Sequence, residues 1–183
     1  MLLDSYKIFK QANDLVRQCR TRNVEYIIED LGIKIYYESD FSDLLGMYTF
    51  RWNHRMIFMN ARINGYLKQM VLAHELGHDQ RHRDIAKAGK PLKEFNLFSM
   101  KDTTEYEANA FASHILLEND EVYTLAKQGY DVVTIAQMLG ADINLMLIKL
   151  QEMNRLEYEF KIPMQGDPYF FKKIKGNDLP WSE

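Results

Sequence analysis

The hydrophobic positions of the first thirty residues repeat at the spacing of an α-helix. Apolar side chains recur every three or four residues from residue 5 to residue 30, with an interruption over residues 21–23. Because a period of 3.6 places such side chains on one helix face, the pattern predicts two consecutive helices. Gly32 follows the second one, and a glycine just beyond the last periodic residue is a common helix stop.

Three short segments rich in β-branched and aromatic residues come next. They are residues 33–37 (IKIYY), 46–52 (GMYTFRW) and 55–59 (RMIFM), and Asn53-His54 is predicted as a hairpin turn between the last two. The order of elements predicts a small antiparallel sheet. A strand of this sheet beside the next helix would offer its backbone groups to an extended peptide.

Residues 66–82 (YLKQMVLAHELGHDQRH) form the segment around which the chain is organised. Apolar residues lie on both sides of this predicted helix, which indicates that it is buried; they are Leu67, Met70, Val71, Leu72 and Leu76. Gly77 is a poor helix former in the middle of the segment. We expect it to mark the close approach of another backbone.

The same segment contains an H-E-x-x-H motif formed by His74, Glu75 and His78. Residues four apart lie one turn apart on the same helix face. Both imidazoles can therefore bind one metal ion, and zinc suits such nitrogen ligands. Glu75, about a quarter turn away, can reach a water at the metal without binding the metal, as a general base must. The alternative is a chance histidine pair on a solvated helix, and the buried character of the helix argues against it.

A catalytic zinc site needs a third protein ligand, and the next predicted helix offers two carboxylates. This helix begins at Asp102-Thr103-Thr104, a good set of N-cap residues, and contains EYEANAFASHILLEN. Glu105 lies on or beside the apolar face of this helix. A carboxylate directed at the core needs a partner such as a metal ion, so we assign Glu105 as the third ligand. Glu107 lies nearly opposite, on the same face as His114, and is expected to be a solvated carboxylate near a helix start. Asn109 could accept a hydrogen bond from a ligand histidine and fix its tautomer.

Residues 81–101 between these two helices show no periodic pattern. We interpret them as an irregular, solvated connection, with a lid over the site or a contact with a partner as the alternatives.

The last third of the chain has a helix-turn-helix-like pattern but the wrong charge for DNA. Residues 131–153 predict two helices around a turn at Gly140. Between residues 131 and 159, five acidic residues stand against only Lys149 and Arg155. A DNA-binding domain needs a basic face, so we expect no direct nucleic-acid binding. We instead expect residues 129–183 to pack on a catalytic domain formed by residues 1–128. Residues 168–175 are expected to add an edge strand or to dock on the surface.

The composition of the chain supports a soluble globular protein. Its hydrophobic content is 46%, its charged content is 27% and its net charge is -3, values that do not favour nucleic-acid or acidic-membrane partners. No apolar run approaches the roughly 20 residues of a membrane span. The single cysteine, Cys19, excludes an internal disulfide, and we expect a cytoplasmic location.

Taken together, the segments HELGH and EYEANAFASHILL resemble the ImmA/IrrE family of bacterial metallopeptidases. The resemblance is best over residues 33–117. It implies an α+β fold: a mainly helical zincin-like domain with a small antiparallel sheet, followed by the helix-turn-helix-like segment. It also supports a Zn²⁺ site formed by His74, His78 and Glu105, with Glu75 as the catalytic residue. Members of the family often have a histidine one turn after the H-E-x-x-H motif, and His82 matches it. We expect His82 beside the site rather than as a fourth ligand.

The resemblance also implies a function. Members of this family often belong to mobile elements or prophages and cleave or inactivate a helix-turn-helix repressor encoded beside them. The chain is therefore expected to be a zinc metalloendopeptidase that acts as an anti-repressor. Such chemistry usually uses an additional oxyanion donor, for which Tyr66 and Tyr106 are candidates. The alternative is a zinc-stabilised regulatory module that binds a repressor or DNA without hydrolysis.

Overall fold

The computed structural model describes residues 4–95, 98 and 102–160. In chain order its helices and strands are α1 (Ser5–Cys19), α2 (Val24–Asp30), β1 (Lys34–Glu38), β2 (Gly46–Arg51), β3 (His54–Asn60), α3 (Gly65–Arg81), α4 (Arg83–Lys87), β4 (Leu92–Glu94), α5 (Thr103–Leu116), α6 (Asn119–Lys127), α7 (Val132–Met138) and α8 (Ile143–Arg155). The edge strand expected at residues 168–175 lies outside the described residues.

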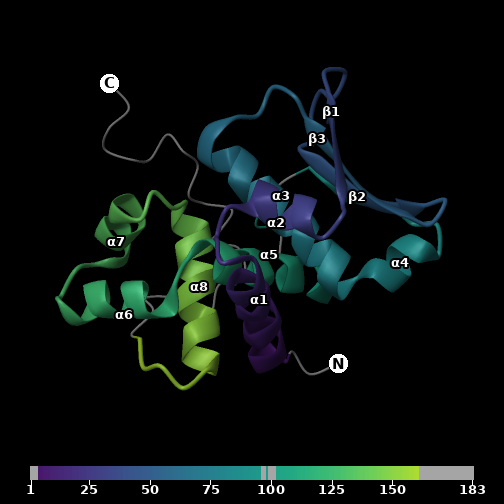
Figure 1. The fold of residues 1–183 in the computed structure, drawn as a ribbon. Coiled ribbons are helices and arrows are strands. Elements are labelled where there is room, and N and C mark those ends of the chain that lie inside the picture. The colour runs from purple at the N-terminus through teal and green to yellow at the C-terminus, as the bar shows by residue number, and fades with distance from the viewer. Residues whose placement is uncertain (1–3, 96–97, 99–101, 161–183) are drawn as a thin grey trace.

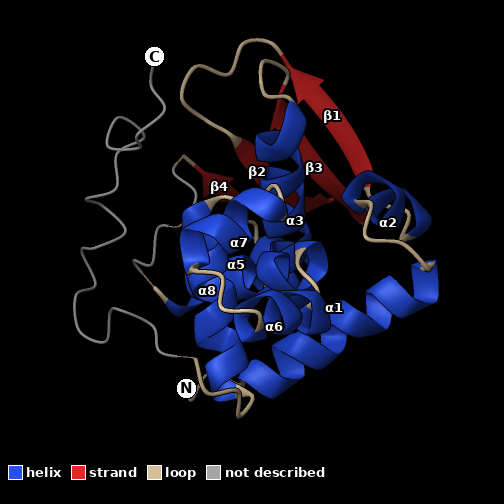
Figure 2. Cartoon of the chain, turned by 90° about the vertical axis from the view of Figure 1, so that its left-hand side faces the viewer, coloured by secondary structure: helices blue, strands red, loops and turns tan. Residues whose placement is uncertain are grey.

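Helices α3 and α5 form the centre of the molecule. The sheet packs on α3 through β2 and β3, whereas α1 and α8 pack on α5 (Figures 1 and 2). Helices α6 and α7 connect α5 to α8 at the end of the molecule that lies away from the sheet (Figure 1). The fold class predicted from the sequence, α+β and mainly helical with a small sheet, is confirmed.

The N-terminal helices begin and end where the hydrophobic pattern predicts. Asp4 caps α1 by accepting a hydrogen bond from a backbone N–H in the first turn, and Asn23 caps α2 in the same way. Such caps satisfy donors that a helix start leaves free. Gly32 follows α2 with a φ of +69°, a conformation that favours glycine.

The sheet is mixed, so the prediction of an antiparallel sheet was wrong for one pair. The strand order is β1-β3-β2-β4, with β1 parallel to β3 and β2 antiparallel to both β3 and β4. Alternation of apolar and polar residues predicts a strand but not its neighbour, and β1 pairs with β3 instead of the next strand in the chain. The hairpin turn lies at Trp52 and Asn53, one residue earlier than predicted, and both residues have positive φ angles as a tight hairpin turn requires.

The connection between the two central helices is more ordered than the sequence indicated. Helix α4 and strand β4 both lie within residues 81–101, which we had interpreted as irregular. Each element has five residues or fewer, too few to show a period in the sequence. Strand β4 forms the outer edge of the sheet next to β2 (Figure 2).

Gly77 lies where α3 and α5 cross, as the sequence predicted. A Cβ atom at this position would lie 2.9 Å from both the Cα and the carbonyl oxygen of Ala108. The obstacle is backbone, which cannot rotate away as a side chain could. The two helices can therefore approach this closely only because residue 77 has no side chain.

The C-terminal helices are joined to α5 by a buried polar cluster. Lys149 on α8 lies 3.0 Å from Nδ1 of His114 on α5, and the hydroxyl of Tyr106 donates a hydrogen bond of 2.6 Å to Glu152. Each of these four side chains is at most 8% exposed.

Among the described residues, no single helix is long and apolar enough to span a membrane, although α7 and α8, bent by 111°, pass that test together on length and composition. The boundary at residue 128 stays a prediction.

Replacing Gly77 with alanine should destabilise the protein. In an ordinary helix interior this change stabilises by about 1 kcal/mol. Here the added methyl group meets the backbone of Ala108, and forcing extra volume into a packed interior costs about 1–3 kcal/mol. Urea unfolding of Gly77→Ala and wild type should show a lower free energy of unfolding for the variant. A stabilised variant would contradict the close approach.

His114 should make the protein less stable in mild acid. Burial, only partly opposed by the Glu152 carboxylate, lowers the pKa of His114 to about 4, whereas an unfolded histidine titrates near 6.5. Between these values the unfolded chain binds a proton that the folded protein does not, so stability falls as the pH falls. From pH 7.5 to pH 5 this contribution amounts to about 2 kcal/mol. Urea unfolding of the metal-free proteins should show that His114→Gln loses about that much less stability than wild type, and an equal loss would refute the assignment.

Candidate metal centre

Two central helices bring the predicted metal ligands together. His74 and His78 lie on consecutive turns of α3, with ring centroids 4.6 Å apart. Glu105 lies in the first turn of α5, where Asp102 caps the helix by accepting a hydrogen bond from the Glu105 N–H. One candidate ligand atom from each of the three residues lies within 4.8 Å of the others. Two imidazoles and a carboxylate converging in this way are a donor set that suits zinc.

The environment of His74 fits a cation at this point. Its Nδ1 atom lies 2.9 Å from Oδ1 of Asn109, an acceptor, so the ring carries its proton on Nδ1. The lone pair of Nε2 then faces the carboxylates of Glu94 at 3.0 Å and Glu105 at 3.3 Å. A lone pair and two anions repel one another unless a proton or a metal ion lies between them. The contact with Asn109 is the one expected from the sequence.

The metal-free site meets this requirement with a proton. Burial lowers the pKa of His74, but hydrogen bonds to Glu105 and Glu94 and the charge of Glu75 outweigh it and raise the pKa to about 10. A metal ion that binds Nε2 must displace this proton, so the same electrostatic field that favours the proton favours the cation. The residues present therefore fit a zinc ion.

The second candidate ligand, His78, contacts His82, which in turn contacts the charged residue Glu107. Nδ1 of His78 lies 3.0 Å from Nδ1 of His82, and Nε2 of His82 lies 3.4 Å from the carboxylate of Glu107. Glu107 in turn accepts hydrogen bonds of 2.9 and 3.0 Å from the guanidinium of Arg81. His82 thus lies beside the site, as expected. Glu107 is only 8% exposed, so the expectation of a solvated carboxylate was wrong.

The reason for this error is that α5 is covered on every side. A helix in contact with one neighbour has a buried and an exposed face, and the sequence argument placed Glu107 and His114 on the exposed one. In the structure, α3 lies on one side of α5 and α1 and α8 lie on others. Both residues are therefore buried, and each is stabilised by a partner contributed by another helix.

Glu75 follows His74 on α3, and its carboxylate is buried near the candidate ligands His74 and Glu105. It is fully buried, and its carboxylate faces the backbone of β2 at Tyr48. Burial is the main cause that raises the pKa of Glu75, to about 8. A Cβ atom on Gly46 would lie 2.6 Å from Oε1 of Glu75, so the bare backbone of β2 lies directly against this carboxylate.

The sequence analysis missed two residues at this site. Gly46 could have been recognised because glycine within a strand often marks a close approach. Glu94 could not, because it lies on the three-residue strand β4, where no motif or period singles it out. The tyrosines proposed as oxyanion donors lie elsewhere. The hydroxyl of Tyr106 donates a hydrogen bond to Glu152 on α8, and the half-buried Tyr66 lies near Asp142, the N-cap residue of the same helix.

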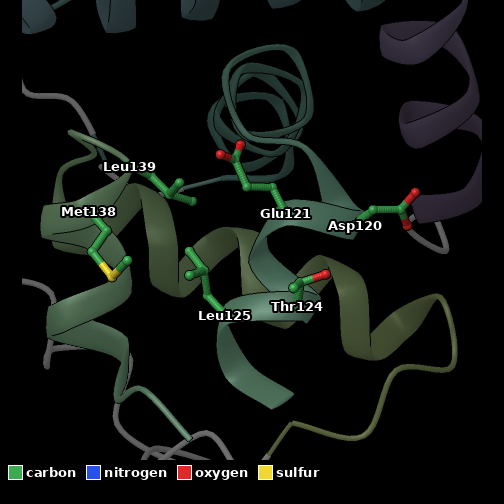
Figure 3. Close-up of a pocket in the computed structure, with 6 residues that line it drawn as sticks. All are labelled: Asp120, Glu121, Thr124, Leu125, Met138 and Leu139. Atoms are coloured by element: carbon green, nitrogen blue, oxygen red, sulfur yellow. The ribbon is translucent and has the colours of Figure 1, made fainter. Parts of the chain in front are cut away.

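A separate cavity of about 390 Å³ lies between α6 and α7 (Figure 3). Its lining combines acidic and apolar side chains; the residues are Asp120, Glu121, Thr124, Leu125, Met138 and Leu139. It contains none of the candidate ligands and no histidine or cysteine, so it offers no metal-binding chemistry of the kind found between α3 and α5.

Replacing Glu105 with glutamine should weaken zinc binding strongly, whereas the same change at Glu107 should not. Glu105 contributes one of three candidate ligand atoms, while Glu107 lies behind His82 and bonds Arg81. Loss of a residue behind a ligand typically costs 10- to 100-fold in metal affinity, and loss of a ligand costs more. We expect a more than 100-fold weaker affinity for Glu105→Gln and roughly tenfold or less for Glu107→Gln. Competition with a chromophoric chelator measures both; the reverse order would make Glu107 the ligand.

Comparison with known proteins adds two findings. Residues 28–151 match the model of a peptidase family described as the IrrE N-terminal-like domain. The chain is also 30% identical over 146 residues to "Uncharacterized immunity region protein 2" of Bacillus phage phi105, which covers 79% of this chain and 90% of that protein. Both matches extend over most of the chain, so they bear on the whole arrangement of α3, α5 and the sheet rather than on one motif.

Proposed function

The chain belongs to the ImmA/IrrE family of metallopeptidases, and on this premise we propose that it is a zinc-dependent, site-specific endopeptidase that cleaves a helix-turn-helix repressor of a prophage or another mobile element. The observation that carries the proposal is the convergence of His74, His78 and Glu105 beside the buried carboxylate of Glu75. Metal-assisted hydrolysis of a peptide bond needs this combination of ligands and base.

In this proposal His74, His78 and Glu105 hold the zinc ion. When bound, zinc supplies a Lewis acid that activates water and polarises the scissile carbonyl. Asn109 keeps the proton of His74 on Nδ1, so that the lone pair of Nε2 remains directed at the ligand set. The contact between Nδ1 of His78 and His82 holds the second imidazole in place.

Glu75 is the proposed general base and acid. Its carboxylate accepts a proton from the attacking water and then donates that proton to the leaving amine. Burial raises the pKa of Glu75 in the metal-free protein to about 8, so its carboxyl group holds a proton more readily than an exposed glutamate does. The backbone of β2 at Gly46 covers one side of the carboxylate and excludes bulk water there.

The choice of a repressor as substrate rests on the relatives of the chain. The similar phage protein is named for an immunity region. The resemblance to the ImmA/IrrE family implies a helix-turn-helix repressor, encoded beside the gene, as the substrate. An enzyme with this role needs a narrow substrate range, so we expect little cleavage of general protein substrates.

A zinc-stabilised module that binds a repressor or DNA without hydrolysis is the alternative. The buried state of α8 disfavours DNA binding, because a recognition helix must present its side chains to the groove. Lys149, one of the two basic residues in this segment, is fully buried. A purely structural metal site also has no need of a carboxylate such as Glu75.

Replacing Glu75 with glutamine should leave zinc binding intact and abolish cleavage. The glutamine side chain keeps the shape of the site but cannot accept the proton, and loss of a general base typically costs 10²- to 10⁴-fold in rate. The test is incubation of the zinc-loaded proteins with a helix-turn-helix repressor encoded beside the gene, followed by intact mass measurement. Wild type should release discrete fragments, and Glu75→Gln should release none in the same time.

Glu118→Gln provides a matched control for this experiment, because Glu118 is exposed at the N-cap position of α6. It should cleave at the rate of wild type. Equal cleavage by Glu75→Gln would remove Glu75 from the mechanism. A stable complex of wild type with an intact repressor would favour the non-hydrolytic module.

A further inference from the structure

Strand β4 runs along the edge of β2 that lies over the candidate metal centre. The two strands are antiparallel, with Glu94 opposite Gly46, Lys93 opposite Met47 and Leu92 opposite Tyr48 (Figure 2). The backbone carbonyl of Glu94 also accepts a hydrogen bond of 2.8 Å from the N–H of Leu45. Gly46 is the residue whose backbone lies against Glu75. The chain at Glu94 therefore passes beside the proposed general base.

The side chains of β4 alternate between the metal centre and solvent. Glu94 is 3% exposed, and its Oε2 atom lies 3.0 Å from Nε2 of His74, the nitrogen proposed to bind the metal. Lys93, the preceding residue, is exposed on the opposite face of the sheet. Successive side chains of a strand point to opposite faces, so the pairing of β4 with β2 itself aims the Glu94 carboxylate at the metal centre.

An extended substrate would need the position that β4 holds. Peptides commonly bind proteins by adding a strand to a sheet edge, and a scissile carbonyl must come within reach of both Glu75 and the metal ligands. The edge of β2 at residues 46–48 is the part of the sheet that β4 covers, and Gly46 within it is in contact range of Glu75. Substrate and β4 therefore compete for the same backbone groups.

The pairing of β4 is short enough to be exchanged. Within the described residues it involves three residue pairs, whereas β2 and β3 share six. Leu92 is half-buried, Lys93 is exposed and only Glu94 is buried. Glu94 thus contributes the contact that fixes β4 over the metal centre.

We propose that the β2 edge is the peptide-docking surface of the enzyme and that β4 is its resident occupant, with Glu94 directed at the metal centre until an extended substrate segment displaces the strand. This inference rests on the proposed peptidase function. A substrate that binds weakly to sheet edges does not open the site, which gives the enzyme a narrow substrate range without a large recognition surface.

A reversible cross-link between β4 and β2 tests the displacement. Met47 and Lys93 are directly opposite, and Lys93 lies on the face away from the metal centre. The variant Met47→Cys/Lys93→Cys, in a Cys19→Ser background, should form a disulfide that holds β4 in place. The control is Arg51→Cys/His54→Cys, an exposed pair that links β2 to β3 and leaves β4 free.

The oxidised β2–β4 variant should cleave the repressor at least tenfold more slowly than after reduction, with unchanged zinc content, because substrate cannot displace the tethered strand. The oxidised and reduced β2–β3 control should cleave equally. An oxidised β2–β4 variant as active as its reduced form would overturn the proposal, because β4 would then be a permanent wall of the site. Absence of cleavage by wild type and by every reduced protein would instead refute the proposed peptidase function.

A second measurement decides the role of Glu94 without proteolysis. Cobalt-substituted wild type and Glu94→Gln are titrated with acetohydroxamate, a small metal-binding probe, and followed by the visible absorption of the cobalt. Removal of the carboxylate charge beside His74 should change the spectrum and tighten acetohydroxamate binding at least fivefold, while Glu118→Gln should match wild type. An unchanged spectrum and affinity in Glu94→Gln would show that Glu94 does not obstruct the metal centre.

Discussion

The metal centre depends on the close crossing of α3 and α5. Its donor atoms come from two separate helices, so their separation is set by how near the two backbones can approach. Gly77 allows the backbone of α3 to touch that of α5 at Ala108. Glu105 lies one turn before this crossing and Asn109 immediately after it, so a single contact positions both the carboxylate ligand and the residue that fixes the tautomer of His74. A larger side chain at position 77 would alter every one of these distances.

The same crossing concentrates negative charge. Glu75, Glu94 and Glu105 surround His74 in a region with little solvent, and the charges of Glu94 and Glu105 help to raise the pKa of Glu75. Buried like charges are costly unless a cation is present. In the metal-free protein a proton on His74 serves this purpose, and the field of the carboxylates makes the site receptive to a divalent ion. Burial is the main cause that raises the pKa of the proposed base in the metal-free protein, and the carboxylates that attract the metal raise it further.

Helix α5 connects this centre to the rest of the molecule. Near its first turns, the Glu107 carboxylate bonds Arg81 of α3, and further along, His114 contacts Lys149 of α8. These buried polar contacts fix α5 on opposite sides, because each group would be left without a partner if the helix moved. The C-terminal helices therefore support the metal centre from a distance, and their acidic character suits a supporting role better than nucleic-acid binding.

The sequence by itself determined the features that depend on spacing along one helix or strand. These are the H-E-x-x-H geometry of α3, the start of α5, the break between α1 and α2, the hairpin of β2 and β3, and the close approach of another backbone at Gly77. Each follows from local periodicity or from the conformational preference of one residue. The tertiary structure decided whatever depends on which elements become neighbours: the parallel pairing of β1 with β3, the burial of Glu107 and His114, and the position of Glu94 beside His74. A face predicted as exposed becomes buried when a further helix packs on it, and a three-residue strand acquires a role only through the edge that it covers. Those contacts join residues far apart in the chain, and no local pattern in the sequence encodes them.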